Sequence, residues 1–251
     1  MKRVPFPSHR RWVLGAMRAG HRATPMTALL QVDVTDAWQR LHDKDLSPTA
    51  FVIACVGRAV AAHPDVHAYR DWRGRLVMHD HVDIATMVDI GTSSGRFPLA
   101  HTISDTDTRP VAEISDELHG VRDAPTKGRS GRIMLRWGNA AGRIPGLISL
   151  VYFISRRSSF VRSGIGTVAV SSVGMMLGGN GFGIAEPSLT SLSVIVGGVS
   201  ERPWVVDGGI APRHVLDLCL QVDHRVVDGA PASRCAATLR TLLEDPDLVP
   251  W

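Results

Sequence analysis

Apolar residues recur along the first quarter of the chain with spacings that predict one strand and two helices. Met26–Val34 is apolar and rich in β-formers, so it predicts a strand, and Thr35 is expected to cap a short helix that runs through His42. Pro48 stands in the first turn of a second helix that reaches about His63. This second helix is apolar on nearly all sides, which predicts that it is buried.

The middle of the chain predicts three short strands followed by a surface helix. The strand-like stretches are Val66–Trp72, Arg75–His79 and Val82–Ile90, and a turn at Arg73–Gly74 separates the first two. Pro110–Arg122 carries apolar residues at helical spacing on one side only, namely Val111, Ile114, Leu118 and Val121. This pattern is typical of an amphipathic helix.

The C-terminal third predicts four strands and a closing helix. Gly166–Ser172 and Leu189–Val199 have the composition of core strands, while Trp204–Val206 and His214–Val222 flank a hairpin turn. Pro231 is expected to open a helix that ends near Asp245 and turns four residues inward: Cys235, Leu239, Leu242 and Leu243. Together these elements predict an α/β (α+β) fold, with a mixed central sheet and helices packed on it.

One segment, at about residues 125–165, stands apart from this pattern. No acidic residue lies between Asp123 and Glu186, whereas eight basic residues do: Lys127, Arg129, Arg132, Arg136, Arg143, Arg156, Arg157 and Arg162. Apolar pieces alternate with these arginines, so we expect an inserted helical hairpin. Its charge could face phosphates, nucleic acid or an anionic membrane, although a solvated basic face is the more common outcome.

Composition places the chain among ordinary globular proteins. It has 251 residues, of which 44% are apolar and 21% charged, and this balance excludes a fibrous or disordered chain. We expect one domain over residues 1–251. The cysteines Cys55, Cys219 and Cys235 are too far apart for a metal motif, and the first residues lack a secretory signal, so reduced thiols in the cytoplasm are expected. No apolar run approaches the roughly 20 residues of a membrane span.

The stretch Asp223–Ala230 holds the strongest candidate for chemistry. His224 comes where a strand leaves the sheet, Asp228 follows four residues later, and Gly229 is expected to permit a tight turn into the next helix. A neutral imidazole can take a proton from a thiol, hydroxyl or amine near pH 7. His224 is therefore a candidate general base.

Two other motifs are weaker. His79, His81 and Asp83 alternate polar ligand types, but such residues are common where a turn enters a strand, so no metal site is expected there. The glycine-rich stretch 178–183 lacks the lysine and Ser/Thr of a nucleotide-binding loop. A flexible active-site or coenzyme-contact loop is the favoured interpretation.

Asp223–Ala230 resembles the signature of the catalytic domain of dihydrolipoyl acyltransferases, the 2-oxo acid dehydrogenase acyltransferase family, whose fold is that of chloramphenicol acetyltransferase. Further similar stretches are Val4–Pro5, Arg10–Arg11, Gln31–Thr35, Ser47–Pro64, Val82–Pro98, Ala112–Ser115 and Gly166–Gly174. The resemblance covers most of the chain, with Pro125–Ile165 as the exception.

The resemblance implies a role for four residues. His224 matches the general base, and Ser171 matches the hydroxyl residue that stabilises the oxyanion. Asp228 matches a carboxylate that orients the site through an arginine, for which Arg10 is the best match. Ser172 is the alternative to Ser171, because adjacent strand residues point to opposite faces of a sheet and only one of them can serve.

The resemblance also implies a reaction and an assembly. We expect acyl transfer between coenzyme A and a small acceptor, in a homotrimer or a larger assembly of trimers where His224 of one chain meets Ser171 of its neighbour. Because the sequence contains no lipoyl domain, a free-standing member without a covalent lipoyl group is expected. No nucleic-acid partner and no membrane association are expected. The alternatives are a non-catalytic trimeric scaffold and a peripheral membrane or lipid-handling protein.

Overall fold

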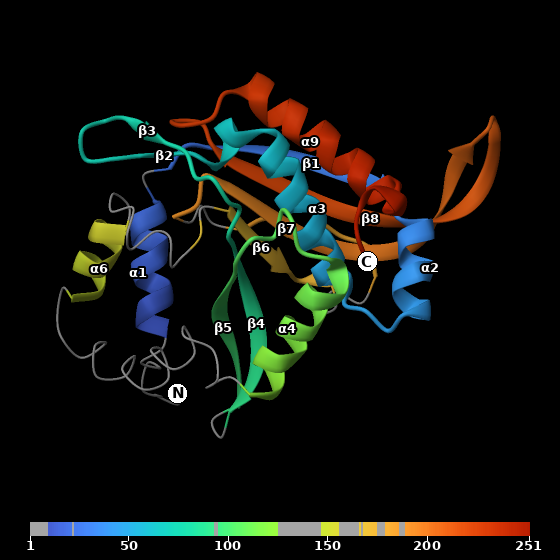
Figure 1. The fold of residues 1–251 in the computed structure, drawn as a ribbon, viewed down its shortest axis with the longest axis horizontal. Helices are drawn as coiled ribbons and strands as arrows, with labels where there is room; N and C mark the ends of the chain where they lie inside the picture. The colour runs from blue at the N-terminus through green and yellow to red at the C-terminus, as the bar shows by residue number, and fades with distance from the viewer. Residues whose placement is uncertain are drawn as a thin grey trace, which may run out of the picture.

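The computed structural model describes residues 10–21, 23–92, 95–124, 147–155, 166, 168–174, 179–185 and 189–251 (Figure 1). Its strands are β1 (Pro25–Asp33), β2 (Tyr69–Arg70), β3 (Leu76–Val77), β4 (Ile84–Thr92), β5 (Gly95–Ile103), β6 (Val168–Ser172), β7 (Leu192–Val206) and β8 (Gly209–Asp223). The helices are α1 (Arg10–Gly20), α2 (Thr35–Asp43), α3 (Pro48–Ala62), α4 (Val111–Asp123), α6 (Leu147–Ser155) and α9 (Gly229–Glu244). Short 3₁₀ turns lie at Pro64–His67 and Pro246–Leu248.

The main sheet is mixed, and its strand order is β1-β8-β7-β6-β4-β5. The outer pairs are antiparallel, whereas β6 runs parallel to both of its neighbours, β7 and β4. The small strands β2 and β3 form a separate two-stranded ribbon. The predicted mixed sheet is therefore confirmed.

Helices α3, α4 and α9 cover one face of this sheet and bury its core (Figure 1). Alternate residues of each strand enter that core, as the two-residue period of a strand requires; in β6 these are Val168 and Val170. Ten of the fifteen residues of α3 are buried, which explains why its apolar residues surround the helix. Consequently Ser172 shares the helix-covered face, and Ser171 lies on the opposite one.

A long hairpin arm extends from the sheet where β7 and β8 continue past their neighbours (Figure 1). Its turn places Asp207 and Gly208 at φ 51° and 81°, both in the left-handed region that a two-residue hairpin turn needs. Near the tip, Val205 and Ile210 are 71% and 79% exposed. The hairpin predicted at this turn is confirmed.

Two local expectations are wrong, each for a specific reason. Thr35 does not cap α2, because it is already the first helical residue; the Asp33 carboxylate instead accepts hydrogen bonds from the Thr35 amide at 3.0 Å and hydroxyl at 2.6 Å. The expected strand at Val66–Trp72 is reduced to Tyr69–Arg70, since Pro64 starts a 3₁₀ turn through His67.

The described part of the unusual segment is α6, while residues 125–146 and 156–165 of the expected helical hairpin lie outside the described residues, as do Val4 and Pro5. α6 packs against α1 (Figure 1). Its Phe153 ring meets Trp72 edge-on at 5.5 Å between centroids. Leu150, Phe153 and Ile154 are exposed. No helix among the described residues has the length and apolarity to cross a membrane.

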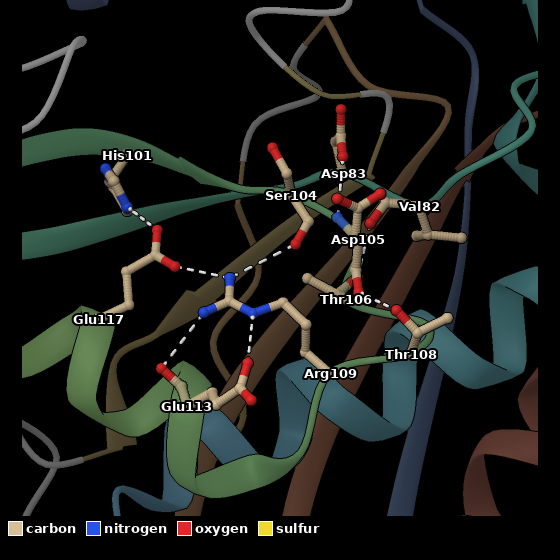
Figure 2. A network of polar contacts seen from close by, with 10 residues as sticks. All are labelled: Val82, Asp83, His101, Ser104, Asp105, Thr106, Thr108, Arg109, Glu113 and Glu117. Carbon is tan, nitrogen blue, oxygen red and sulfur yellow. Dashed lines mark hydrogen bonds and ion pairs between the residues drawn. The ribbon is translucent and has the colours of Figure 1, made fainter.

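A polar network fixes α4 against the end of β5 (Figure 2). Glu117 accepts hydrogen bonds from His101 at 2.7 Å and from Arg109 at 2.6 Å, and Arg109 also reaches the Glu113 carboxylate and the Ser104 carbonyl oxygen at 3.5 Å. The hydrogen bond from His101 and the Arg109 cation lower the pKa of Glu117 although partial burial opposes this shift. The network thus holds an ionised carboxylate between the sheet edge and α4.

Candidate active site

The turn after β8 is held to the sheet by main-chain hydrogen bonds. The Asp223 amide donates to the Ser191 carbonyl, and the His224 amide donates to Thr24, which precedes β1. Val227 is buried, and its amide donates back to the carbonyl oxygen of Asp223 at 3.0 Å. The backbone that carries His224 is therefore fixed on three sides.

The side chain of His224 has a defined tautomer. Its Nδ1 lies 3.1 Å from the carbonyl oxygen of Val227, and because a carbonyl oxygen only accepts, Nδ1 must carry the proton. In the neutral ring, Nε2 is then unprotonated. Since the side chain is 46% exposed, this nitrogen can receive a proton from a bound molecule.

Asp228 lies close to the same ring nitrogen but faces solvent. Its Oδ1 is 3.8 Å from His224 Nδ1, and its side chain is 88% exposed. Arg10, the exposed first residue of α1, makes no described hydrogen bond or ion pair with Asp228 within one chain. The pairing of these two residues therefore stays a prediction.

Gly229 does not make the tight turn that was expected of it. Its φ is not positive, and it begins α9 directly after Asp228, the N-cap residue. A Cβ placed at Gly229 would meet Met26 Sδ at 3.8 Å, an ordinary contact. The turn is made instead by Asp223, whose carbonyl oxygen accepts from Val226 and Val227.

An ion pair between Arg225 and Asp223 fixes the start of this turn. Arg225 donates to the Asp223 carboxylate from Nε at 2.8 Å and from Nη2, and its amide also donates there. Burial alone would raise the pKa of Asp223, but the hydrogen bonds from Arg225 outweigh it and lower the pKa. The two-pronged contact holds the Arg225 guanidinium on the Asp223 carboxylate.

Ser171 and Ser172 lie at the far end of β6 from this turn. Ser171 pairs with Ile195 of β7, and Ile195 pairs with Cys219 of β8. His224 follows Cys219 by five residues along β8. At about 3.3 Å per residue and about 4.8 Å per strand, His224 and Ser171 are separated by about 16 Å along the sheet and about 10 Å across it. One chain therefore does not bring them into contact.

A cavity of about 970 Å³ opens where β6 ends. β6 has five residues, whereas β4 has nine and β7 has fifteen, so beyond Ser172 the described strands on either side continue without β6 between them. Thr86–Asp89 of β4 and Val196, Gly197 and Val199 of β7 line this gap. Residues from both faces of the sheet thus reach the cavity.

The cavity has an apolar floor and a charged rim. Buried side chains from α2, α3, α4 and β8 line the floor, among them Ala37, Leu41, Phe51, Val52, Leu118 and Leu216. The exposed lining residues include His119 and Arg122 of α4 and Asp45. An apolar volume of this size with few polar groups is typical of a small-molecule site.

The residues of the weaker metal motif, His79, His81 and Asp83, contact other residues of the fold. The His79 ring lies tilted against those of His67 and Tyr69, at 5.2 and 5.5 Å between centroids, whereas His81 Nδ1 lies 3.5 Å from Asp105 Oδ1, so the two histidines have different partners. Asp83 accepts a hydrogen bond from the Asp105 amide. Among the described residues, no group of three or more His, Cys, Asp or Glu side chains could hold a metal ion.

Sequence reasoning missed a buried carboxylate, Asp217, in the middle of β8. It accepts hydrogen bonds from Gln31 at 3.0 Å, from Arg202 and from the Gly181 amide at 2.8 Å. The available signal was one aspartate inside the apolar run Val215–Val222, since a charge within a core strand requires partners. The cavity left no such signal, because it depends on where a strand ends.

Comparison with known proteins shows which family these features resemble. Residues 162–250, which include Ser171, His224 and Asp228, match the model of the 2-oxoacid dehydrogenases acyltransferase (catalytic domain). The chain is 24% identical over 261 residues to the dihydrolipoyllysine-residue acetyltransferase component of the pyruvate dehydrogenase complex of Staphylococcus epidermidis. That match covers 97% of this chain and 51% of the relative, so the chain spans about half the length of the curated relatives it matches.

Solved structures share the fold over nearly the whole chain. The cubic core of the pyruvate dehydrogenase multienzyme complex aligns with a TM-score of 0.71 at 19% identity, covering 99% of this chain and 93% of that one. The Azotobacter vinelandii dihydrolipoamide acetyltransferase, in a study of the catalytic role of a serine, a histidine and an asparagine, gives the same values. Chloramphenicol acetyltransferase aligns with a TM-score of 0.53 at 14% identity, covering 97% and 100%.

The fold is thus that of chloramphenicol acetyltransferase, a mixed sheet with helices on it. The resemblance to the catalytic domain of the 2-oxo acid dehydrogenase acyltransferase family, inferred from the stretch around His224, is confirmed. The roles of the four site residues stay predictions.

Proposed function

We propose that the protein moves an acyl group between coenzyme A and a small acceptor that carries a thiol, hydroxyl or amine. The observation that carries the proposal is the hydrogen bond from His224 Nδ1 to the Val227 carbonyl oxygen, within a stretch that matches the family's catalytic domain. This bond leaves Nε2 as a base at an exposed strand end. A buried histidine with both nitrogens bonded could not act in this way.

The proposed reaction begins with proton transfer from the acceptor to His224 Nε2. The freed nucleophile forms a bond to the thioester carbonyl carbon, and the Ser171 hydroxyl donates to the resulting oxyanion. When the tetrahedral intermediate collapses, the carbon–sulfur bond breaks and the coenzyme A sulfur takes the proton back from the imidazolium. Transfer to coenzyme A is the same sequence in reverse.

The proposed site is completed by a second copy of the chain. This proposal is supported by the distance between His224 and Ser171 in one chain, about 16 Å along the strands and about 10 Å across them. No side chain spans this distance. A ring of three copies would bring His224 of one chain to Ser171 of the next, and rings repeat such a contact around a closed axis. We therefore propose a homotrimer, alone or within a larger assembly of trimers.

Asp228 and Arg10 are proposed to act between copies as well. The Asp228 carboxylate is exposed at the N-terminus of α9. Arg10 is also exposed. In the assembly we propose that this pair orients the turn around His224 as a brace, not as an acid.

The cavity beside Ser172 is proposed to hold the coenzyme A thioester. Its apolar floor suits an acyl chain or the pantetheine arm, and Arg122 on its rim makes no ion pair with a described residue, so its charge is available to phosphates. Asp45 on the same rim would repel a phosphate placed near it. The anionic end is thus proposed to lie toward α4.

The acceptor could be a lipoyl group on another protein or a free small molecule. The chain's buried, unpaired thiols Cys55, Cys219 and Cys235 support a reducing, cytoplasmic location for the reaction. Thiol release from a panel of acyl-coenzyme A compounds should be measured with dihydrolipoamide, alcohols and amines as acceptors. Turnover by the wild type that persists undiminished in His224→Ala would reject His224 as the base.

A further inference from the structure

Asp217 lies outside the residues assigned above, yet it joins three segments of the chain. Its side chain is only 2% exposed, on the sheet face opposite the helices. Gln31 reaches it from the neighbouring strand β1, Arg202 from β7, and the Gly181 amide from the segment that follows β6. Both carboxylate oxygens thus accept hydrogen bonds, Oδ1 from Gln31 and Oδ2 from Arg202 and the Gly181 amide.

The charge on Asp217 is maintained by these donors. Burial would raise the pKa of its carboxyl, but the hydrogen bonds from Arg202, Gln31 and the Gly181 amide outweigh burial and lower it. A buried ion pair is often no more stabilising than apolar residues of the same size. The Asp217–Arg202 pair is therefore better explained by a need to hold its neighbouring segments in position than by a gain in stability.

The segment that Asp217 holds is packed backbone against backbone. β7 has a bulge at Gly197 and Gly198, directly opposite Asp217. A Cβ at Gly198 would come within 1.7 Å of the Gly179 carbonyl oxygen, and one at Gly197 within 2.2 Å of that of Gly181. The Gly198 amide donates to the Gly181 carbonyl oxygen at 3.0 Å. Residues 179–181 therefore lie directly on the bulge.

The same packing reaches the end of β6. A Cβ at Gly174 would lie 1.9 Å from the Gly197 carbonyl oxygen, and the Val173 amide donates to that of Val196. Gly174, Gly179 and Gly197 all line the cavity. Ser171 and Ser172 come immediately before Val173, so any shift of this wall moves the proposed oxyanion donor.

We propose that Asp217 is a positioning residue of the acyl-transfer site, whose buried carboxylate holds the glycine segment 179–183 against the β7 bulge and thereby fixes the cavity wall beside Ser171 and Ser172. This inference rests on the proposed function for its catalytic consequence, but the anchoring itself is independent of any reaction. A residue that only stabilises the fold would affect the melting temperature and leave the segment's position unchanged once stability is restored.

The test replaces the ion pair by apolar residues of similar size in the double variant Asp217→Leu/Arg202→Met. Such replacements commonly keep stability, so the melting temperature should stay near that of the wild type, and the variant's oligomeric state should be unchanged. Amide hydrogen exchange over residues 179–185 should become faster because Gly181 loses its acceptor. The kcat should fall by up to about 100-fold with a smaller change in KM.

Glu117→Gln is the matched control, because it removes a carboxylate that also binds an arginine, at the β5 side of the sheet. It should lower the melting temperature without altering exchange over residues 179–185. If the double variant exchanges and turns over like the wild type, the proposal is wrong. If the wild type itself shows no turnover, the proposed function fails, and the exchange rates still decide whether Asp217 anchors the segment.

Discussion

The imidazole Nδ1 of His224 lies 3.1 Å from the carbonyl oxygen of Val227, three residues ahead in the same turn. The contact is local, so it does not require a second copy of the chain or a ligand. It sets the tautomer of the ring before any substrate binds. The turn itself therefore sets the tautomer of the proposed base, and the proposed assembly has to bring it both a substrate and the Ser171 hydroxyl of the neighbouring copy.

Replacing His224 tests this role. His224→Ala should lower kcat by about 100- to 10,000-fold, because general base catalysis contributes about that much. Binding of coenzyme A should change little, since His224 does not line the cavity. Thiol release gives the rate, and calorimetric titration of coenzyme A gives the affinity; a large loss of affinity with an unchanged rate would contradict the assignment.

The two serines should have separable effects. Ser171→Ala is expected to reduce kcat by about 100- to 1,000-fold if its hydroxyl serves the oxyanion. Ser172 points to the helix-covered face and lines the cavity, so Ser172→Ala should alter mainly the KM for the acyl donor. Steady-state kinetics of both variants decides between them, and the reverse pattern would assign the oxyanion to Ser172.

Mixing two inactive variants tests whether the site is shared. When His224→Ala and Ser171→Ala chains are co-assembled in equal amounts, some interfaces combine an intact His224 with an intact Ser171. Activity should return to roughly a quarter of the wild-type value, because random mixing forms such a site one time in four. Mixed assemblies that remain inactive, despite confirmed exchange of chains, would rule out a site between copies.

Arg122 should recognise the charged end of the acyl carrier. Arg122→Gln is expected to raise the KM for acyl-coenzyme A about tenfold and to leave the KM for the corresponding acyl-pantetheine unchanged, because the latter has no nucleotide phosphates. The effect should diminish at high salt. Arg240→Gln, on the exposed side of α9 and away from the cavity, is the control, and an equal effect on both donors would remove Arg122 from this role.

The Glu117 network predicts how stability changes with pH. The pKa of Glu117 is lower in the folded chain, because of His101 and then Arg109, so the folded state binds fewer protons than the unfolded one. Its contribution is therefore present above the unfolded value of about 4.3 and is lost as pH falls through the lower folded value. Melting temperatures recorded between pH 7 and pH 3 should fall less steeply for Glu117→Gln than for the wild type.

The sequence predicted the elements whose boundaries depend on local pattern. The helix from Pro48 and the hairpin at Asp207–Gly208 were found because proline and turn residues mark them. The predictions for Thr35 and Gly229 are wrong, since Val34 is the N-cap residue of α2, Asp33 accepts hydrogen bonds from Thr35, and the Asp223 carbonyl oxygen closes the tight turn. In each case a neighbouring residue has the role that the local sequence pattern predicts for Thr35 or Gly229.

The candidate site was predictable only in part for a similar reason. His224 and Asp228 are close in sequence, so their motif was visible, whereas Asp217 gains its meaning from Gln31 and Arg202, which are distant in the chain. The separation of Ser171 from His224 follows from strand register, which no local pattern specifies.

The early end of β6 has a consequence for engineering the cavity. The cavity opens where β6 ends, and the backbone of Gly174, Gly179 and Gly197 forms part of its wall. Side-chain substitutions can therefore change the depth of the cavity but not its location. Lengthening β6 past Ser172 by two paired residues would fill the space between β4 and β7. The range of acyl carriers that fit is thus set by the length of one strand, and a graft between Ser172 and Gly179 would be the direct way to change it.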